Sequence, residues 1–275
     1  MSQDLTKANA TLLEFNQLVE SGQHNEWKGQ LRTGVDLGTT NIVLAVVDEN
    51  NHPVAGATSF SKVVRDGIVV DYMGAVRTVK RMKAELEDRL GVELEAGSCA
   101  IPPGIIPGNV RVIGNVVEAC GFRLTNIVDE PTAAATVLGI TDGAVVDVGG
   151  GTTGISILKD GKVLFTGDEP TGGTHMTLVL AGFLGCPSDE AELIKRDPAQ
   201  ESNVFPVVKP VVEKMASIVK NYMRGYDVET IYVVGGACSF SQFEGVFEKY
   251  IGVPVVKPAA PLMVTPLGIA VNCKL

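Results

Sequence analysis

Two glycine-rich turns with the same order of residue types constrain the fold of this 275-residue chain more than any other feature. In residues 34–41 and again in residues 145–154, an apolar run leads to an aspartate, one or more glycines and a pair of threonines. A second apolar run follows each turn, and this is the pattern of a strand, a tight turn and a strand. The two aspartates, Asp36 and Asp147, stand more than a hundred residues apart. The repeat therefore predicts a duplicated α/β fold in which each half offers one turn to a ligand held between them.

The turns carry groups that suit a phosphate and its metal ion. Gly149, Gly150 and Gly151 have no Cβ, so their backbone can reach positive φ and bring several N–H groups to one point. Such concave clusters bind phosphate. Asp147 ends the preceding strand, where its carboxylate is placed to hold a hydrated metal ion, and Thr152 adds a hydroxyl. A tight hairpin without a ligand has the same short pattern, so a single turn leaves both interpretations open.

Composition and charge narrow the class of protein. The length predicts about two domains, and a formal net charge of -9 argues against a general nucleic-acid binder. No apolar run reaches the length of a membrane span, and the N-terminus has no basic region followed by an apolar core, so we expect neither membrane insertion nor a signal peptide. Five cysteines without C-x-x-C spacing predict reduced thiols in the cytoplasm and no structural zinc.

The first 32 residues form a segment of their own. In residues 4–21, apolar side chains recur at three- and four-residue spacing, which predicts an amphipathic helix that ends at Gly22. A polar linker, residues 23–32, follows it. The apolar face of the helix either packs on the chain's own domain or docks into the groove of a partner, and the sequence leaves both alternatives open.

The rest of the chain alternates predicted strands and helices, as expected for an α/β protein. Ser188 is expected to cap its helix, and Pro206 is the expected start of the longest helix, or a residue shortly after it because Pro210 suits only a first turn. Further strands are predicted at residues 55–60, 99–101, 125–128, 163–166, 230–234 and 253–256. Helices are predicted at residues 73–90, 107–120, from 131 onward, 176–185, 188–196, 206–224, 242–250 and 267–272.

Two helix starts carry candidate site residues. Glu130 stands at a strand-to-helix junction, where active-site carboxylates often lie in open α/β sheets. Its alternative role is that of a surface acid favoured by the helix dipole. Gly172 and Gly173 precede another helix and form a candidate anion site, and His175 is expected to cap that helix.

Five motifs, taken in order, resemble those of the superfamily that includes actin, Hsp70 and the sugar kinases. Each glycine-rich turn is similar to one of the two phosphate motifs of the superfamily, and residues 129–135 are similar to its first connecting helix. Residues 233–236 resemble the adenosine motif, and residues 265–270 resemble the second connecting helix. Together these motifs cover about residues 33–273, which is nearly the whole chain.

The resemblance implies a two-lobed actin/Hsp70 ATPase fold of the ribonuclease H-like kind. The first lobe would be residues 33–139, completed by a C-terminal helix at residues 264–275. The second lobe would be residues 140–263, and the N-terminal helix and linker of residues 1–32 would precede both.

The same resemblance implies ATP or ADP with Mg²⁺ in the cleft between the lobes. Asp36 and Asp147 would hold the water shell of the metal, and Glu130 would help to place the attacking water, which makes Glu130 and Asp147 the expected catalytic residues. Residues that cradle the phosphates or contact the adenosine complete the implied site; they are Gly38, Thr39, Thr40, Gly149, Gly150, Gly151, Thr152, Gly173, Glu192, Lys195, Arg196, Gly235 and Gly236. For Glu192, Lys195 and Arg196, an exposed amphipathic helix remains the alternative.

Within the superfamily, the chain is similar to the chaperone-like proteins of bacterial ethanolamine utilisation at residues 65–69, 129–133 and 209–216. That resemblance implies a protein partner among the ethanolamine-utilisation or microcompartment proteins. It also implies a cytoplasmic location in association with a bacterial microcompartment.

Departures from the superfamily pattern leave two functions open. Short connections after residue 47 and after residue 196 predict that both upper subdomains are reduced or missing, and no counterpart of the Hsp70 catalytic lysine is present. A slow ATPase that switches a partner is supported by the three acids Asp36, Glu130 and Asp147. A non-hydrolysing adaptor is supported by the trimmed cleft and by the N-terminal helix, which resembles helices that carry cargo into microcompartments. A sugar kinase is a third and weaker alternative, because its substrate domain has no visible match.

Overall fold

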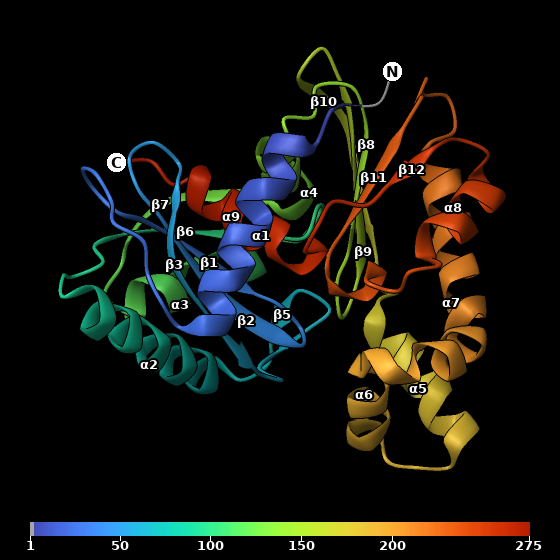
Figure 1. Ribbon diagram of the computed structural model, residues 1–275, viewed down its shortest axis with the longest axis horizontal. Helices are drawn as coiled ribbons and strands as arrows, with labels where there is room; N and C mark the ends of the chain where they lie inside the picture. Colours follow the sequence, from blue (N-terminus) through green and yellow to red (C-terminus); the bar gives the residue numbers. More distant parts are fainter. Residues whose placement is uncertain (1–2) are drawn as a thin grey trace.

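The computed structural model describes residues 3–275, which form two lobes, each built on a five-stranded sheet (Figure 1). The first sheet has the order β3-β2-β1-β6-β7, and its strands are β1 (Arg32–Leu37), β2 (Asn41–Val47), β3 (Pro53–Phe60), β6 (Ala96–Ile101) and β7 (Arg123–Asp129). The second has the order β10-β9-β8-β11-β12, and its strands are β8 (Gly143–Val148), β9 (Thr153–Lys159), β10 (Lys162–Glu169), β11 (Ile231–Val234) and β12 (Val255–Val256).

The two sheets repeat one topology. In each, the first three strands of the lobe pair antiparallel and the next two join in parallel. The parallel strands need crossover helices, which cover the outer faces. This arrangement confirms the predicted duplicated α/β fold, and it brings the carboxyl ends of β1 and β8 to the same space between the lobes.

On the first lobe, helices α2 (Tyr72–Leu90) and α3 (Pro107–Ala119) pack on the outer face of the sheet. Asp71 starts α2, because its Oδ1 accepts a hydrogen bond of 2.8 Å from the Gly74 N–H. Gly91 ends the helix in the left-handed conformation, with a φ of 69°.

Two helices lie between the lobes and join them through a shared core. They are α4 (Glu130–Leu138) and α9 (Val264–Val271). A Cβ added at Gly268 would lie 2.1 Å from the Ala133 carbonyl oxygen, so the two helices cross at a distance that only glycine permits. The Ser98 hydroxyl of the first sheet also donates to the Ile269 carbonyl at 2.7 Å.

The outer helices of the second lobe are α5 (Gly173–Leu184), α6 (Ser188–Arg196), α7 (Glu201–Tyr222) and α8 (Phe243–Ile251). The predicted start of α7 at Pro206 is wrong, because the helix begins five residues earlier and contains both Pro206 and Pro210. The two prolines lie four residues apart on the exposed face, so the carbonyls that lose an N–H partner face water. Ser188 is not the cap of α6 either, since Pro187 holds that position.

Helix α1 (Thr6–Ser21) packs its apolar face on the first lobe. Leu12 and Phe15 are fully buried, and a Cβ added at Gly56 of β3 would lie 2.6 Å from the Phe15 ring. The helix ends at Gly22 with a φ of 67°, as predicted. Of the two alternatives for this helix, the structure therefore favours packing on the chain's own domain.

The upper parts of both lobes are small. In these parts, which lie in the lower half of Figure 1, the first lobe has only the two-residue strands β4 (Val64–Arg65) and β5 (Ile68–Val69), and the second lobe has the tip of α5 with α6. This agrees with the expected reduction of both upper subdomains. No helix of residues 3–275 is long and apolar enough to cross a membrane.

Candidate functional site

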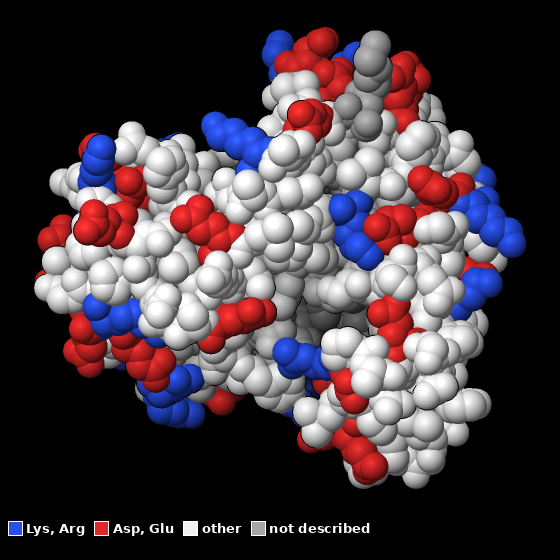
Figure 2. Space-filling view, viewed as in Figure 1, with Lys and Arg blue, Asp and Glu red and all other residues white. Residues whose placement is uncertain are grey.

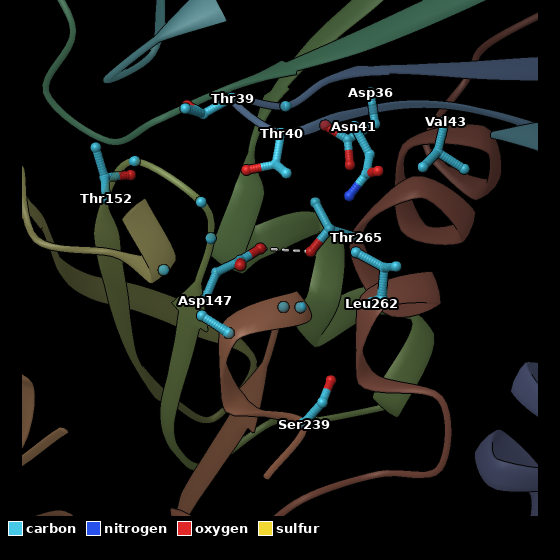
Figure 3. A pocket seen from close by; sticks show the side chains of 18 of the residues that line it. Asp36, Thr39, Thr40, Asn41, Val43, Asp147, Thr152, Ser239, Leu262 and Thr265 are labelled. Carbon is cyan, nitrogen blue, oxygen red and sulfur yellow. Dashed lines mark hydrogen bonds between the residues drawn. The ribbon is translucent and has the colours of Figure 1, made fainter. Parts of the chain in front are cut away.

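A cleft with a volume of about 380 Å³ opens between the two lobes. All of the site residues expected from the sequence line it; they are Asp36, Gly38, Thr39, Thr40, Glu130, Asp147, Gly149, Gly150, Gly151, Thr152, Gly173, Glu192, Lys195, Arg196, Gly235 and Gly236. They come from both sheets and from three helices, so the fold collects segments that are distant in sequence (Figure 3).

The two glycine turns face each other across the cleft. We call the β1–β2 turn, residues 38–40, the first hairpin and the β8–β9 turn, residues 149–152, the second hairpin. A Cβ added at Gly150 would lie 2.3 Å from the Thr40 Oγ1, and one at Gly151 would lie 2.7 Å from the Thr39 Oγ1. The glycines are thus required for this close approach.

The second hairpin has amides available for an anion. The Gly149 N–H closes the turn by donating to the Thr152 carbonyl at 3.0 Å. In the described chain, the N–H groups of Gly150 and Gly151 donate to no protein acceptor. Two neighbouring free amides at the head of a turn form the concave donor cluster that binds phosphate.

Three carboxyl groups converge beneath the hairpins. Asp36 and Asp147 are the next-to-last residues of β1 and β8, and Glu130 begins α4. Burial raises the pKa of Asp36 to about 7, and the nearby charge of Asp147 adds to the effect. Burial and the charges of Asp147 and Asp36 also raise the pKa of Glu130 well above its usual range. None of the three forms an ion pair with a residue in the described range 3–275.

Asp147 has two neighbours that fix its side chain. Burial raises its pKa to about 6, while a 2.5 Å hydrogen bond from the Thr265 hydroxyl to Oδ2 opposes that rise. Figure 3 shows the Asp147 carboxylate directed at this hydroxyl at the start of α9. Gly235 has a φ of +90°, and a Cβ there would lie 2.5 Å from the Asp147 Oδ1. The site therefore needs glycine at this position to leave room for the carboxylate.

Sequence reasoning missed two polar residues at the site. Thr265 belongs to a motif that the sequence analysis used only to locate a connecting helix, and its partner Asp147 is 118 residues away. Asp168 lies on β10 opposite Gly154 of β9, and its Oδ1 is buried without a hydrogen-bond partner among the described residues. Burial raises its pKa to about 6. No local pattern distinguishes either residue from an ordinary strand or helix position.

Helix α6 is tied to the start of α5 by hydrogen bonds from Lys195, which also forms a buried ion pair with Glu192 of its own helix. The Lys195 Nζ lies 2.6 Å from the Glu192 Oε2 and donates to the Gly173 carbonyl at 3.0 Å and the Thr177 Oγ1 at 2.8 Å. The side chains of Lys195 and Glu192 are only 11% and 16% exposed, so the alternative of a solvated helix face is wrong for these two. Burial lowers the pKa of Lys195, and the Glu192 carboxylate opposes that shift. Arg196 remains exposed at the edge of the cleft.

The start of α5 supports the second hairpin. The Gly173 N–H donates to the Gly149 carbonyl at 2.9 Å, and the Thr174 N–H donates to the Gly150 carbonyl at 2.7 Å. Both amides are therefore already hydrogen-bonded within the protein. The expected anion site at this helix start is wrong, because these donors are not free to bind an anion. His175 caps the helix as expected, because its Nδ1 accepts from the Gly172 N–H at 3.4 Å.

The sequence of this chain is similar to those of several known proteins. Two family profiles match, that of the Hsp70 protein at residues 73–196 and that of the cell division protein FtsA at residues 144–268. The ethanolamine utilization protein EutJ of Salmonella typhimurium is 45% identical over 238 residues, which are 86% of this chain and 84% of that protein.

Two of the solved structures with a similar fold are those of a EutJ protein and of an MreB protein. The crystal structure of the ethanolamine utilization protein EutJ from Carboxydothermus hydrogenoformans has a TM-score of 0.92 and 47% identity, over 97% of this chain and 98% of that chain. MreB 5 of Spiroplasma citri bound to AMPPNP has a TM-score of 0.72 over 88% of this chain and 95% of that chain. At 16% identity, that likeness shows the fold alone.

Proposed function

The chain belongs to the EutJ family of ethanolamine utilization proteins, and from that premise we propose that it is an ATP-binding, chaperone-like protein of ethanolamine utilisation. We propose further that it is a slow Mg²⁺-dependent ATPase which acts on microcompartment enzymes or their assembly. The observation that carries the proposal is the meeting of two glycine hairpins and three unpaired acids in one cleft.

The residues present fit a nucleotide and its metal ion. A volume of about 380 Å³ falls within the usual range of small-molecule sites. Among the described residues there is no group of three or more acids, histidines and cysteines arranged to hold a metal by themselves. Two carboxylates are nevertheless the usual protein share of a Mg²⁺ site, because this ion keeps several waters and takes its other ligands from phosphates.

At the phosphate end of the cleft, the protein would bind the nucleotide through backbone N–H donors held in place by the fold. The free amides of Gly150 and Gly151 would donate to phosphate oxygens, and Asp36 and Asp147 would accept from water on the metal. A bound Mg²⁺ would neutralise part of the phosphate charge. Phosphoryl transfer depends mainly on positioning the reactants and stabilising their charge, so these groups are of the types that slow hydrolysis requires.

Glu130 would orient the attacking water and accept its proton. Its carboxyl stands at the first position of α4 and lines the cleft with Asp36 and Asp147, and burial raises its pKa, which makes its ionised form a stronger base. At the other end of the cleft, Gly235 and Gly236 would allow the backbone to approach the adenosine. Arg196 would be the available cation there, since the donors of Lys195 are already used.

One observation favours a second candidate, a non-hydrolysing adaptor with an actin-like fold. The first and second hairpins approach so closely that a side chain at Gly150 would collide with Thr40. A terminal phosphate can lie between the two hairpins only if the lobes separate. A protein that does not hydrolyse ATP does not need this separation. In either case, the partner we propose is a protein of ethanolamine utilisation or of its microcompartment. We propose that the two proteins bind each other in the cytoplasm.

Hydrolysis decides between the two candidates. Phosphate release would be followed for the wild type and for Glu130→Gln with saturating Mg-ATP, and binding would be measured in parallel. The ATPase proposal predicts slow release that falls about 100-fold in the variant while binding persists. Tight binding with no release above the variant's level in the wild type would overturn the ATPase and support the adaptor.

A further inference from the structure

An apolar groove lies at the tip of the second lobe, outside the cleft described above. It has a volume of about 480 Å³ and lies between α5, α6 and the start of α7. Leu193 and Phe183 line it, and at 72% and 70% exposure they are the two most exposed large apolar side chains in the described part of the protein. Contiguous exposed apolar surface of this kind marks interaction sites in proteins that are otherwise polar outside.

Two further exposed apolar side chains on α5 adjoin the groove. Val179 precedes Phe183 by one turn and is 42% exposed, and Leu184, which lines the groove, is 44% exposed. In Figure 2 this tip, at the bottom of the view, is largely white, with Asp and Glu side chains along its lower edge. These side chains belong to no core cluster and do not line the cleft, so the apolar surface has no partner among residues 3–275.

Two acids lie on the α6 side of the groove. Asp197, the C-cap residue of α6, lines the groove, and Glu190 precedes Leu193 by three residues on the same face of the helix. The two acids flank Leu193 and stand about 10 Å apart along the helix axis. Of the residues described, no lysine or arginine lines the groove. Charge complementarity therefore selects an occupant that is apolar in the centre and basic at both flanks.

Helix α6 also lines the cleft between the lobes. Glu192, Lys195 and Arg196 line that cleft, and Asp197 borders both cavities. The helix is held to α5 through Lys195, which donates to the Gly173 carbonyl beside the second hairpin. A ligand that moves α6 from the cleft side must also change the width of the groove.

We propose that this groove docks an amphipathic helix of a protein partner, with apolar residues along one face and lysine or arginine at both flanks, and that nucleotide in the cleft sets its affinity. The second half of the statement rests on the proposed function, whereas the first does not. Two packed helices with an apolar seam between them accept a third helix in the manner of other helix-in-groove complexes. The partner so defined is the protein on which the cleft would act.

The test uses the full chain and a synthetic probe. The probe is a fluorescein-labelled peptide of roughly 16 residues, long enough to form a helix, with leucines at i, i+3, i+4 and i+7 and lysines at both flanks. A second peptide has glutamates in place of the lysines. Fluorescence anisotropy is measured for the wild type, Leu193→Glu, Phe183→Glu and Glu190→Lys, and for Leu13→Glu, which changes an exposed leucine of α1 (56% exposed).

The expected result is a preference of at least about tenfold for the lysine peptide. Leu193→Glu and Phe183→Glu should lose about tenfold in affinity, Glu190→Lys should shift the preference toward the glutamate peptide, and Leu13→Glu should bind like the wild type. Equal affinity for both peptides, or unchanged binding by Leu193→Glu, would overturn the inference. So would sedimentation showing a dimer that Leu193→Glu abolishes, because the occupant would then be a second copy.

Nucleotide dependence is a separate arm. With Mg-AMPPNP present, the affinity for the lysine peptide should change by at least about threefold in the wild type and not at all in Asp36→Ala. If no nucleotide binds, the proposed function fails while the peptide preference still stands on its own. If nucleotide binds and the affinity for the peptide is unchanged, the coupling is wrong and the nucleotide site remains.

Discussion

The upper part of the first lobe is the short β4–β5 hairpin, whereas that of the second lobe consists of the helices α5 and α6; both parts lie in the lower half of Figure 1. The two lobes are alike at the cleft, since in each an aspartate is the next-to-last residue of the central strand and a glycine turn follows it. The end of the cleft proposed for the phosphates is therefore nearly symmetrical, whereas the end proposed for the adenosine takes its charged side chains from the second lobe alone. The two halves are alike at the glycine turns and differ in their upper parts.

The contact that joins the two lobes is the most sensitive point of this comparison. Gly268→Ala should lower the free energy of unfolding by about 3 kcal/mol or more, because the new Cβ would lie 2.1 Å from a backbone oxygen of α4. Gly245→Ala is the matched control in α8, where a Cβ meets nothing within 4 Å; it should stabilise by about 0.5–1 kcal/mol. Urea unfolding measures both. Equal effects would mean that the lobes are not held at this crossing.

The acids of the phosphate end predict a pH dependence of stability. Asp36 has an ordinary pKa of 3.8 in the unfolded chain and about 7 in the folded protein, so the folded state binds the proton more tightly. The free energy of unfolding therefore falls as pH rises from about 4 to about 7. Asp36→Asn should exceed the wild type by on the order of 1–3 kcal/mol at pH 8 and match it below pH 4. Asp88→Asn, on the exposed side of α2, is the control.

A constant difference between Asp36→Asn and the wild type at all pH values would contradict this origin. It would mean that the substitution acts through packing and that the two aspartates do not accumulate charge as the structure indicates.

Asp36 and Asp147 differ in one hydrogen-bond partner, the Thr265 hydroxyl that donates to Asp147. A substitution at Thr265 tests the effect of that hydrogen bond. Thr265→Val removes the hydroxyl that donates to Asp147 at 2.5 Å and should cost about 1–2 kcal/mol of stability. It should also raise the pKa of Asp147 further above 6, so that Mg-nucleotide affinity falls more at pH 6.5 than at pH 8. Thr265→Ser keeps the hydroxyl and should restore both. If the serine variant behaves like the valine variant, the methyl group and not the hydrogen bond is responsible.

The smallest effect is expected across the upper edge of the cleft. The Lys62 Nζ forms an ion pair with Asp189, which connects the two lobes, but the side chains are 60% and 78% exposed. Water screens such pairs, so a double-mutant cycle of Lys62→Ala and Asp189→Ala should give a coupling energy below about 0.5 kcal/mol. A coupling above about 2 kcal/mol would show that the edges, and not α4 with α9, hold the lobes together.

The sequence predicted the symmetrical end of the cleft better than the asymmetrical end. The hairpins were visible because the same order of aspartate, glycine and threonine occurs twice in the chain, and the repeat strengthened a pattern that leaves both interpretations open when it occurs once. The environment of Lys195 was not visible, because its partners Gly173 and Thr177 come from a different helix. Thr265 and Asp168 were missed for the same reason, since only the fold brings them to Asp147 and to Gly154.

Errors at helix ends have a local cause. The start of α7 was placed at Pro206 because proline suits a first turn, yet the exposed face of this helix lets water satisfy the carbonyls that proline leaves free. The N-terminal helix ends where the sequence predicts, at Gly22, and begins two residues later than predicted, at Thr6. Its packing against β3 depends on Gly56, a long-range contact that no local pattern contains.

Calorimetric titration with Mg-ATP, for the wild type and for Asp36→Ala, tests the central claim most directly. We predict saturable binding of one nucleotide by the wild type, with an affinity that rises between pH 6 and pH 8 as Asp36 and Asp147 ionise, and no binding by the variant. No heat and no thermal stabilisation of the wild type at about millimolar ATP would contradict the account and leave the two hairpins as a structural contact between the lobes.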